Sequence, residues 1–318
     1  MTASLRPALI LASLLCALTL ACSSEPEDAT ATKAETTPCP AGQTVCAFRF
    51  GDAPAGHTWM GGPLAVVGQS DDDIIITNQL ARYVIRGAAQ GAAMYGTRGG
   101  NVVDAGYLGG LAGTAATPVD PLRALVLTVG MHLVRPDKLE VVETGEAGVA
   151  TVRVQGPLVT FPTLDEALNT AMPKVSVVHE YRLRAGSTTL EISTILTPSG
   201  ADKTQVAVAE FLFWGGEVAM YLPGIGDQEQ PLANTTDTIG FTPRRPGAAA
   251  TAPGFSCAIT SLEKMTTLDS GAIKAIMHGN LKVPAAGLTV RRFLTCGGPG
   301  GSDLAAAMAQ GRAAAGLG

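Results

Sequence analysis

Short runs of alternating apolar and polar residues recur along almost the whole chain, and they limit what it can fold into. The clearest run covers residues 175–184, and a second one follows at residues 188–197. Between them, Ala185-Gly186-Ser187 suits a tight turn. A period of two places every second side chain on the same face of a strand, so this pair of runs predicts an antiparallel β-hairpin.

A second hairpin is predicted at residues 138–143 and 149–155, joined by the turn-rich residues 144–148. Further strands are predicted at residues 74–77, 81–86, 102–105, 206–214, 238–242, 255–260, 273–278 and 289–296. Helices are few. Residues 163–166 have the capping-box spacing ahead of a short helix ending at Ala171, and Ser302 can cap a C-terminal helix that starts at about residue 302.

Strands at such close intervals, without amphipathic helices between them, predict an all-β protein. The expected architecture is an antiparallel β-sandwich with a few short peripheral helices. No repeat of about 20 to 50 residues is visible, which argues against a propeller. At 318 residues, 46% of them hydrophobic and 15% charged, the chain can bury a sizeable core. We therefore expect one β-sandwich domain over residues 39–318.

Residues 1–21 predict export. Arg6 gives a positive start, and residues 8–20 form an apolar run that is too short to span a membrane. Leu18-Thr19-Leu20-Ala21-Cys22 resembles a bacterial lipobox, in which the signal peptide is cleaved before a cysteine that carries lipid. We expect a lipoprotein, acylated with palmitate-type chains at Cys22, on the periplasmic face or the surface of the cell envelope. An ordinary secretory signal cut elsewhere is the alternative.

Residues 22–38 are expected to form a disordered tether, because after Cys22 they contain no aromatic and no large aliphatic side chain. The formal net charge is −5, and it becomes −6 once a leader containing Arg6 is removed. The sequence contains no basic patch of the kind that would predict nucleic-acid binding. Lipid on Cys22 is then the expected membrane attachment, and no cofactor or metal is predicted.

Four cysteines remain for the exported domain, an even number in a compartment where disulfides persist. Pairing Cys39 with Cys46 and Cys257 with Cys296 closes the smallest loops and is the expected arrangement, although four cysteines allow three pairings. A zinc site is the alternative, but these spacings match no zinc-binding pattern.

One segment stands out as a possible ligand site. Residues 96–110 are rich in glycine, which allows close backbone approach, and they also carry Arg98, Asn101, Asp104 and Tyr107. The structural alternative is a loop in which Asp104 satisfies buried backbone donors. The acidic run at residues 71–73 points to alternate faces of a strand, so it is expected to be a solvated strand start.

The histidines give no local catalytic pattern. His179 and Glu180 are adjacent on a predicted strand and face apart, and His132 has no partner nearby in the sequence. No nucleophile elbow and no His-Glu-x-x-His motif is present. The glycine-rich residues 297–301 lack the lysine of a phosphate-binding loop.

The order of several segments resembles a known family. Residues 66–78, 81–85 and 99–105, followed by 139–143, 150–156, 180–183 and 290–294, are similar to a β-rich extracellular domain common in myxobacterial proteins. The resemblance covers about residues 60 to 312. It implies a supersandwich related to galactose mutarotase-like folds, of the kind found upstream of metal-dependent hydrolase domains. Here no hydrolase domain is expected, and no mutarotase acid or base can be placed on a matching position.

We therefore expect a lipid-anchored β-sandwich of the cell envelope that binds carbohydrate or another envelope partner. The alternative is a carbohydrate-active enzyme, an epimerase, lyase or hydrolase that uses carboxylate and histidine groups. The candidate groove residues for either function are Arg98, Asn101, Asp104, Tyr107, His132, His179 and Glu180. A groove holding at least two of Asp104, His132, His179 and Glu180 would favour the enzyme, whereas exposed Trp and Tyr faces would favour binding.

Overall fold

Burial alternates along the central strands as their sequence does. The computed structural model describes residues 39–53, 70–88, 98–108, 122–161, 171–200, 204–214, 218–224, 226–227, 236–243, 256–270, 273–297 and 303–318. Strand β10 (Val175–Arg184) buries every second side chain and pairs antiparallel with β11 (Thr189–Pro198). The hairpin predicted from the alternating sequence is therefore confirmed.

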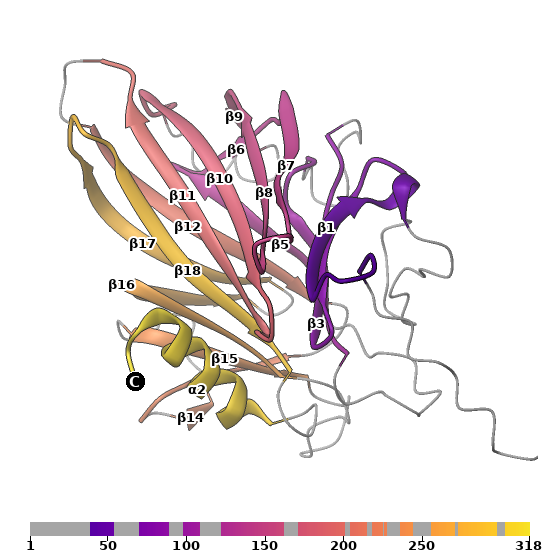
Figure 1. The fold of residues 1–318 in the computed structure, drawn as a ribbon. Helices are drawn as coiled ribbons and strands as arrows, with labels where there is room; N and C mark the ends of the chain where they lie inside the picture. The colour runs from indigo at the N-terminus through magenta and orange to yellow at the C-terminus, as the bar shows by residue number, and fades with distance from the viewer. Residues whose placement is uncertain are drawn as a thin grey trace, which may run out of the picture. The chain divides into compact units, whose positions relative to one another are not determined.

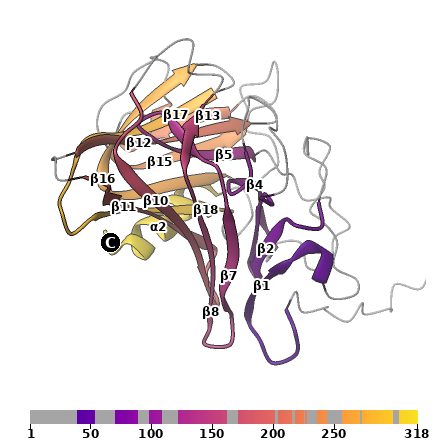
Figure 2. The same cartoon turned by 90° about the horizontal axis from the view of Figure 1, so that it is seen from above.

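Two antiparallel layers are built around this hairpin, and we call the one that contains it sheet B (Figures 1 and 2). Its strands, in spatial order, are β7 (Lys138–Thr144), β8 (Val149–Gly156), β10, β11, β18 (Leu288–Cys296), β16 (Cys257–Ser270), β15 (Thr236–Pro243), β13 (Val218–Leu222) and β14 (Gly226–Asp227). The second predicted hairpin, β7 with β8, is also confirmed.

Sheet A forms the other layer. Its strands run in the order β1 (Val45–Arg49), β2 (Ile74–Asn78), β3 (Ala81–Ile85), β4 (Val102–Tyr107), β5 (Leu122–Val129), β12 (Thr204–Trp214) and β17 (Ile273–Val283). Two short strands, β6 (His132–Val134) and β9 (Leu158–Thr160), extend from the end of β5, and a 3-10 helix, η1 (Phe50–Asp52), follows β1. The all-β, antiparallel prediction is confirmed.

Strand β16 belongs to both sheets, because its two halves pair with different neighbours. Its first half lies between β15 and β18 in sheet B, with Cys257 opposite Cys296. Its second half lies beside β17 in sheet A, with Thr267 opposite Ile276. The two layers are thus joined through one continuous strand.

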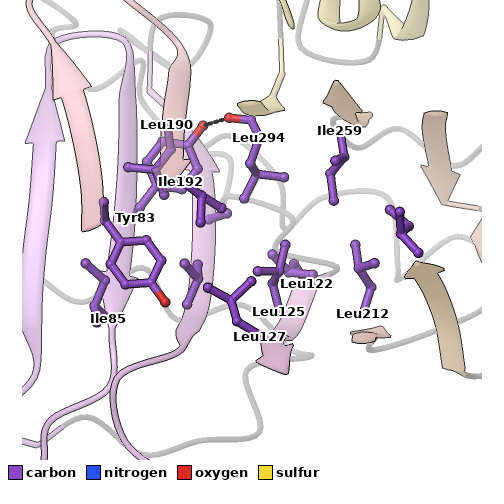
Figure 3. Packing of buried hydrophobic residues seen from close by; sticks show 14 of the residues in the cluster. Tyr83, Ile85, Leu122, Leu125, Leu127, Leu190, Ile192, Leu212, Ile259 and Leu294 are labelled. Atoms are coloured by element: carbon purple, nitrogen blue, oxygen red, sulfur yellow. Dashed lines mark hydrogen bonds between the residues drawn. The ribbon is translucent and has the colours of Figure 1, made fainter. Parts of the chain in front are cut away.

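The main core lies between the layers and takes side chains from both. Figure 3 shows part of it, with Tyr83 from β3 near Leu190 and Leu294 of sheet B, and Leu212 from β12 opposite Ile259 of β16. The hydroxyl of Tyr83 lies 2.6 Å from the carbonyl oxygen of Thr188 and 3.2 Å from that of Leu294. A buried phenol therefore satisfies its polar end on the opposite layer.

Sheet A is buried on its outward face as well. Outward-facing residues of β5 and β12 form a second apolar cluster in which Phe161 meets Phe211 edge to face at 5.7 Å. Sheet B differs, because the outward residues of β7, β8, β10 and β11 are mostly half-buried or exposed. The two sheets therefore present very different outward surfaces.

Both expected disulfides are present. Cys39 bonds to Cys46, and Cys257 bonds to Cys296 across the β16–β18 pair. The second bond crosslinks two neighbouring strands within sheet B, where it lies on the inner face in the main core.

The C-terminal helix α2 (Leu304–Ala315) is confirmed, but its predicted cap is not. The side chain of Asp303, rather than Ser302, accepts a hydrogen bond from the amide of Ala306 at 3.1 Å. Its aspartate oxygen serves the orphan amide as the serine hydroxyl would have done. The other predicted helix falls on residues 162–170, which lie outside the described residues.

The acidic run at residues 71–73 is not uniformly solvated. Asp73 is fully buried and accepts backbone hydrogen bonds from Ser70 at 3.0 Å and Gly87 at 2.7 Å. It also pairs with Arg86 at 3.3 Å. Burial raises the pKa of Asp73 although these partners favour its charged form. For this residue the prediction of a solvated strand start was wrong, because its oxygens are used to close the loop before β2.

Residues 37–318 form one compact unit. Within the ranges that the structure describes, no helix has the length and apolar character needed to cross a membrane.

Candidate functional site: a buried polar cluster between the sheets

Charged and polar side chains interrupt the core where the two sheets face each other. Strand β12 places Glu210 on the same face as Val208 and Leu212, which belong to the main core. Strand β18 does the same with Arg292, between Val290 and Leu294. We call the group that meets here the inner polar cluster; its members are His179, Tyr181, Thr194, Glu210, His278 and Arg292.

An ion pair joins the two layers at the centre of the cluster. Nε of Arg292 lies 2.9 Å from Oε1 of Glu210, so a sheet B guanidinium meets a sheet A carboxylate. Nε2 of His278 lies 3.2 Å from the other carboxylate oxygen, Oε2. Both oxygens of Glu210 thus face a nitrogen, which a buried carboxylate requires.

The far side of Arg292 is held by sheet B itself. Its Nη2 donates to Oγ1 of Thr194 at 2.8 Å, and its Nη1 donates to the carbonyl oxygen of Val290 at 2.8 Å. Nδ1 of His179 lies 3.0 Å from the same Thr194 hydroxyl. The guanidinium is therefore fixed on three sides, and His179 is linked to it through one hydroxyl.

The cluster is closed to solvent, since its members are at most 2% exposed. Burial by itself would raise the pKa of Glu210, but the charges of His278 and Arg292 outweigh it, and the pKa lies below its usual value. Burial also lowers the pKa of Arg292, an effect that Glu210 opposes. The net result is a carboxylate that stays ionised between two nitrogen partners.

His179 behaves differently because no carboxylate of the described residues contacts it. Burial, assisted by the positive charge of Arg292, lowers the pKa of His179 to about 3. The imidazole is therefore neutral at physiological pH. The hydroxyl of Tyr181 donates to the carbonyl oxygen of Gly100 at 2.7 Å. Burial raises the pKa of Tyr181.

Chemically, the cluster has the components of acid–base chemistry in an enclosed position. Glu210 can accept a proton, and His278 can carry one. Three buried polar atoms of the cluster, Nδ1 of His278, Oε1 of Glu210 and Nε of Arg292, make no hydrogen bond among the described residues, although the last two face each other as an ion pair. Among the described side chains, no three His, Cys, Asp or Glu residues gather closely enough to hold a metal ion.

The four candidates from the glycine-rich segment lie on or beside β4 in sheet A. Asn101 is buried; its side chain donates to the carbonyl oxygen of Arg98 at 3.1 Å and accepts from the amide of Leu127 at 3.1 Å. Tyr107 packs directly on Gly297, where an added Cβ would come within 2.3 Å of it. The hydrogen bond from Leu127 to Asn101 ties this loop to β5.

Asp104 is also buried, in register with Val84 on the neighbouring strand. Its negative charge favours the charged form of Arg82, whose pKa burial lowers. Asp104 and Arg82 thus form an electrostatic couple on sheet A. The ligand site and the structural role of Asp104 both stay predictions.

The side chains of the remaining three candidates, His132, His179 and Glu180, lie in three different surroundings. His132 lies on β6 in sheet A, with Nδ1 2.7 Å from the carbonyl oxygen of Gly130 in its own turn. His179 faces the inner polar cluster. Glu180 faces outward from the same strand and binds Arg153 through Nε at 2.8 Å and Nη2 at 2.6 Å. The structure brings only His179 into the inner cluster.

Sequence reasoning missed Glu210, Arg292 and the role of His278. A signal for them was present in the alternation itself. Glu210 falls on the apolar phase of Val206, Val208, Leu212 and Trp214, and Arg292 falls on that of Val290 and Leu294. A charged residue in the buried phase of a strand must find a buried partner, because an isolated charge is too costly to bury.

Comparisons with known proteins assign no family. No family model and no curated protein matches the chain. Solved structures with a related shape include a galactose mutarotase-like protein from Lactobacillus casei, with 8% identity, a TM-score of 0.41 and coverage of 70% of this chain and 99% of that one. A galactose mutarotase related enzyme from Lactobacillus acidophilus has 11% identity, a TM-score of 0.38 and coverage of 73% and 99%.

A TPR-domain containing protein from Parabacteroides distasonis gives a TM-score of 0.42 at 9% identity. The match covers 70% of this chain but only 46% of that protein, so the chain spans less than half of its length. These neighbours are consistent with a β-rich domain, and at such values the likeness assigns no function.

Proposed function

We propose that this protein is a lipid-anchored β-sandwich of the bacterial cell envelope that binds a polar envelope component. The observation that carries the proposal is the pair of disulfides, Cys39–Cys46 and Cys257–Cys296. Disulfides persist in exported proteins and are rare in the cytosol. They agree with the export signal and with the lipobox-like sequence that ends at Cys22.

Binding is favoured over catalysis because the acid–base groups of the inner polar cluster are enclosed. Glu210 and His278 are at most 1% exposed, so a dissolved saccharide cannot reach them in this conformation. By contrast, β8, β10 and β11 of sheet B have an open outward face with polar side chains at regular spacing. A flat polar sheet face can contact a polymer without any rearrangement.

Cell fractionation tests the anchor. Cys22→Ser should move the protein out of the membrane fraction, whereas Cys16→Ser, which changes a cysteine within the leader, should leave it there. Equal membrane partition of both variants and the wild type would contradict lipidation at Cys22.

A second function, carbohydrate-active catalysis, is favoured by one observation, the contact of Glu210 with His278 at 3.2 Å. A saccharide turnover assay on the folded wild type and on His278→Gln tests it. Turnover that the variant loses while its melting temperature is kept would replace the binding proposal with the enzyme.

A further inference from the structure

Four arginines lie on the outward face of sheet B, close together in space although far apart in the sequence. Arg153 lies on β8, Arg182 and Arg184 on β10, and Arg291 on β18. Strand pairing aligns them, since Arg153 is in register with Glu180 and Arg182 with Glu191. Neighbouring strands are about 4.8 Å apart, so these cations form one group that we call the arginine face.

Two of these guanidiniums are held in the same way by a glutamate of the neighbouring strand. Nε and Nη2 of Arg153 both contact Oε1 of Glu180, and Nε and Nη2 of Arg291 both contact Oε1 of Glu191, the latter at 2.8 Å each. The remaining amino group, Nη1, takes no part in either contact. Each planar guanidinium is thus oriented while part of its donor set stays available.

Arg153 and Arg291 lie further out than the glutamates that hold them. The Arg153 side chain is 38% exposed and its partner Glu180 18%, while Arg291 is 42% exposed and Glu191 13%. Arg182 is 37% exposed; its Nε donates to Thr151 at 3.3 Å, and its Nη2 lies 3.7 Å from Glu143, which is itself 44% exposed. At Arg153 and Arg291 the sheet therefore presents oriented guanidiniums to solvent above the carboxylates that hold them.

We propose that the arginine face binds the carboxylates of an acidic, uronic-acid-containing polysaccharide of the cell envelope. This deepens the proposed function and rests on it. The sheet already shows guanidiniums of this face paired with carboxylates, and a planar carboxylate is the matching shape for a second such contact. The protein as a whole has a formal net charge of −5 and repels acidic polymers, so binding depends on the oriented guanidiniums of this face.

A polysaccharide fits this surface better than an acidic protein does. Interfaces between proteins depend on buried aromatic or large aliphatic anchors. On the described arginine face the aromatic side chain, Phe293, is buried under the guanidinium of Arg291 at 5.3 Å. Hydroxyl and carboxylate groups of a glycan need no such anchor.

The test measures binding of the full mature protein to polygalacturonate. The variant Arg153→Gln/Arg182→Gln/Arg291→Gln removes the proposed contacts, and Arg135→Gln/Lys264→Gln/Lys282→Gln removes three exposed cations that lie off this face. Wild type and control variant should bind alike, with an affinity that falls as salt rises. The arginine variant should bind about tenfold more weakly or worse at an unchanged melting temperature.

Four outcomes would overturn the proposal: no binding of the wild type to polygalacturonate, equal binding of both triple variants, equal binding of neutral dextran, or tighter binding of polyphosphate or an acidic protein. None of them bears on lipidation of Cys22, which fractionation measures separately. Failure of the ligand assignment is therefore distinguishable from failure of the proposed anchor.

Discussion

Arg292 is the residue whose surroundings place the strongest demand on the fold. It lies in the apolar interior with Glu210 at 2.9 Å, and each charge is tolerated only because of the other. Buried ion pairs of this kind add little net stability over a well-packed apolar pair, but removing one partner leaves an uncompensated charge. This contact could not be predicted from the sequence. The alternation along β12 and β18 shows which residues are buried, but it does not show which strands face each other across the two layers.

Arg292→Met should therefore destabilise the protein strongly. We expect a loss of about 3 to 5 kcal/mol in the free energy of unfolding, because Glu210 is left buried without its cation. Arg291→Met is the matched control on the same strand. Its side chain faces outward and pairs with Glu191, so its loss should cost about 1 kcal/mol or less. Urea unfolding of both variants measures the difference, and similar losses would show that the inner pair is not buried as described.

His179 should make the protein sensitive to acid. Its pKa is lowered from 6.5 to about 3 in the folded state, so the unfolded chain binds a proton more readily between these values. Its contribution to stability is complete above about pH 6.5 and is lost as the pH falls, by at most about 1.4 kcal/mol per pH unit.

His179→Gln should flatten the fall in unfolding free energy between about pH 6.5 and pH 4. The control is His132→Gln, whose ring nitrogen contacts a carbonyl oxygen in its own turn. Urea unfolding at several pH values measures the slopes. A His179→Gln slope as steep as that of the wild type would contradict a buried, neutral imidazole.

At the scale of the elements, the two disulfides should differ in their effect. Cys257 and Cys296 are 39 positions apart, against 7 for Cys39 and Cys46. In the chain-entropy model the larger loop contributes about 4 kcal/mol and the smaller about 2.5 kcal/mol. Replacing Cys257 and Cys296 by alanine should therefore lower the melting temperature more than replacing the other pair. An equal or reversed order would show that native packing, rather than loop length, sets their contribution.

The two hairpins that the sequence predicted most clearly lie in sheet B, on strands with one accessible face. Strands β10 and β11 alternate clearly because their outward side chains are half-buried or exposed. The prediction missed β5 (Leu122–Val129), whose sequence does not alternate, because this strand is buried on both faces. It also ended β16 and β17 too early, since the change of sheet along β16 leaves no break in the sequence.

At the scale of the whole molecule, the two sheets have different roles in the function that we propose. Sheet A is covered by apolar packing on both sides, and its polar residues Glu210 and His278 lie in the core, where Glu210 meets Arg292 of sheet B. Sheet B leaves oriented arginines on its outer side. This division could not be predicted from the sequence, because it depends on which outward face is covered.

The account as a whole depends on the protein being anchored in the envelope by lipid. Mass spectrometry of the N-terminal peptide from the membrane-bound protein tests this most directly. We predict a mature chain that starts at Cys22 and carries a diacylglyceryl group on its sulfur, with both internal disulfides intact. An unmodified N-terminus, or cleavage at any other residue, would contradict the account.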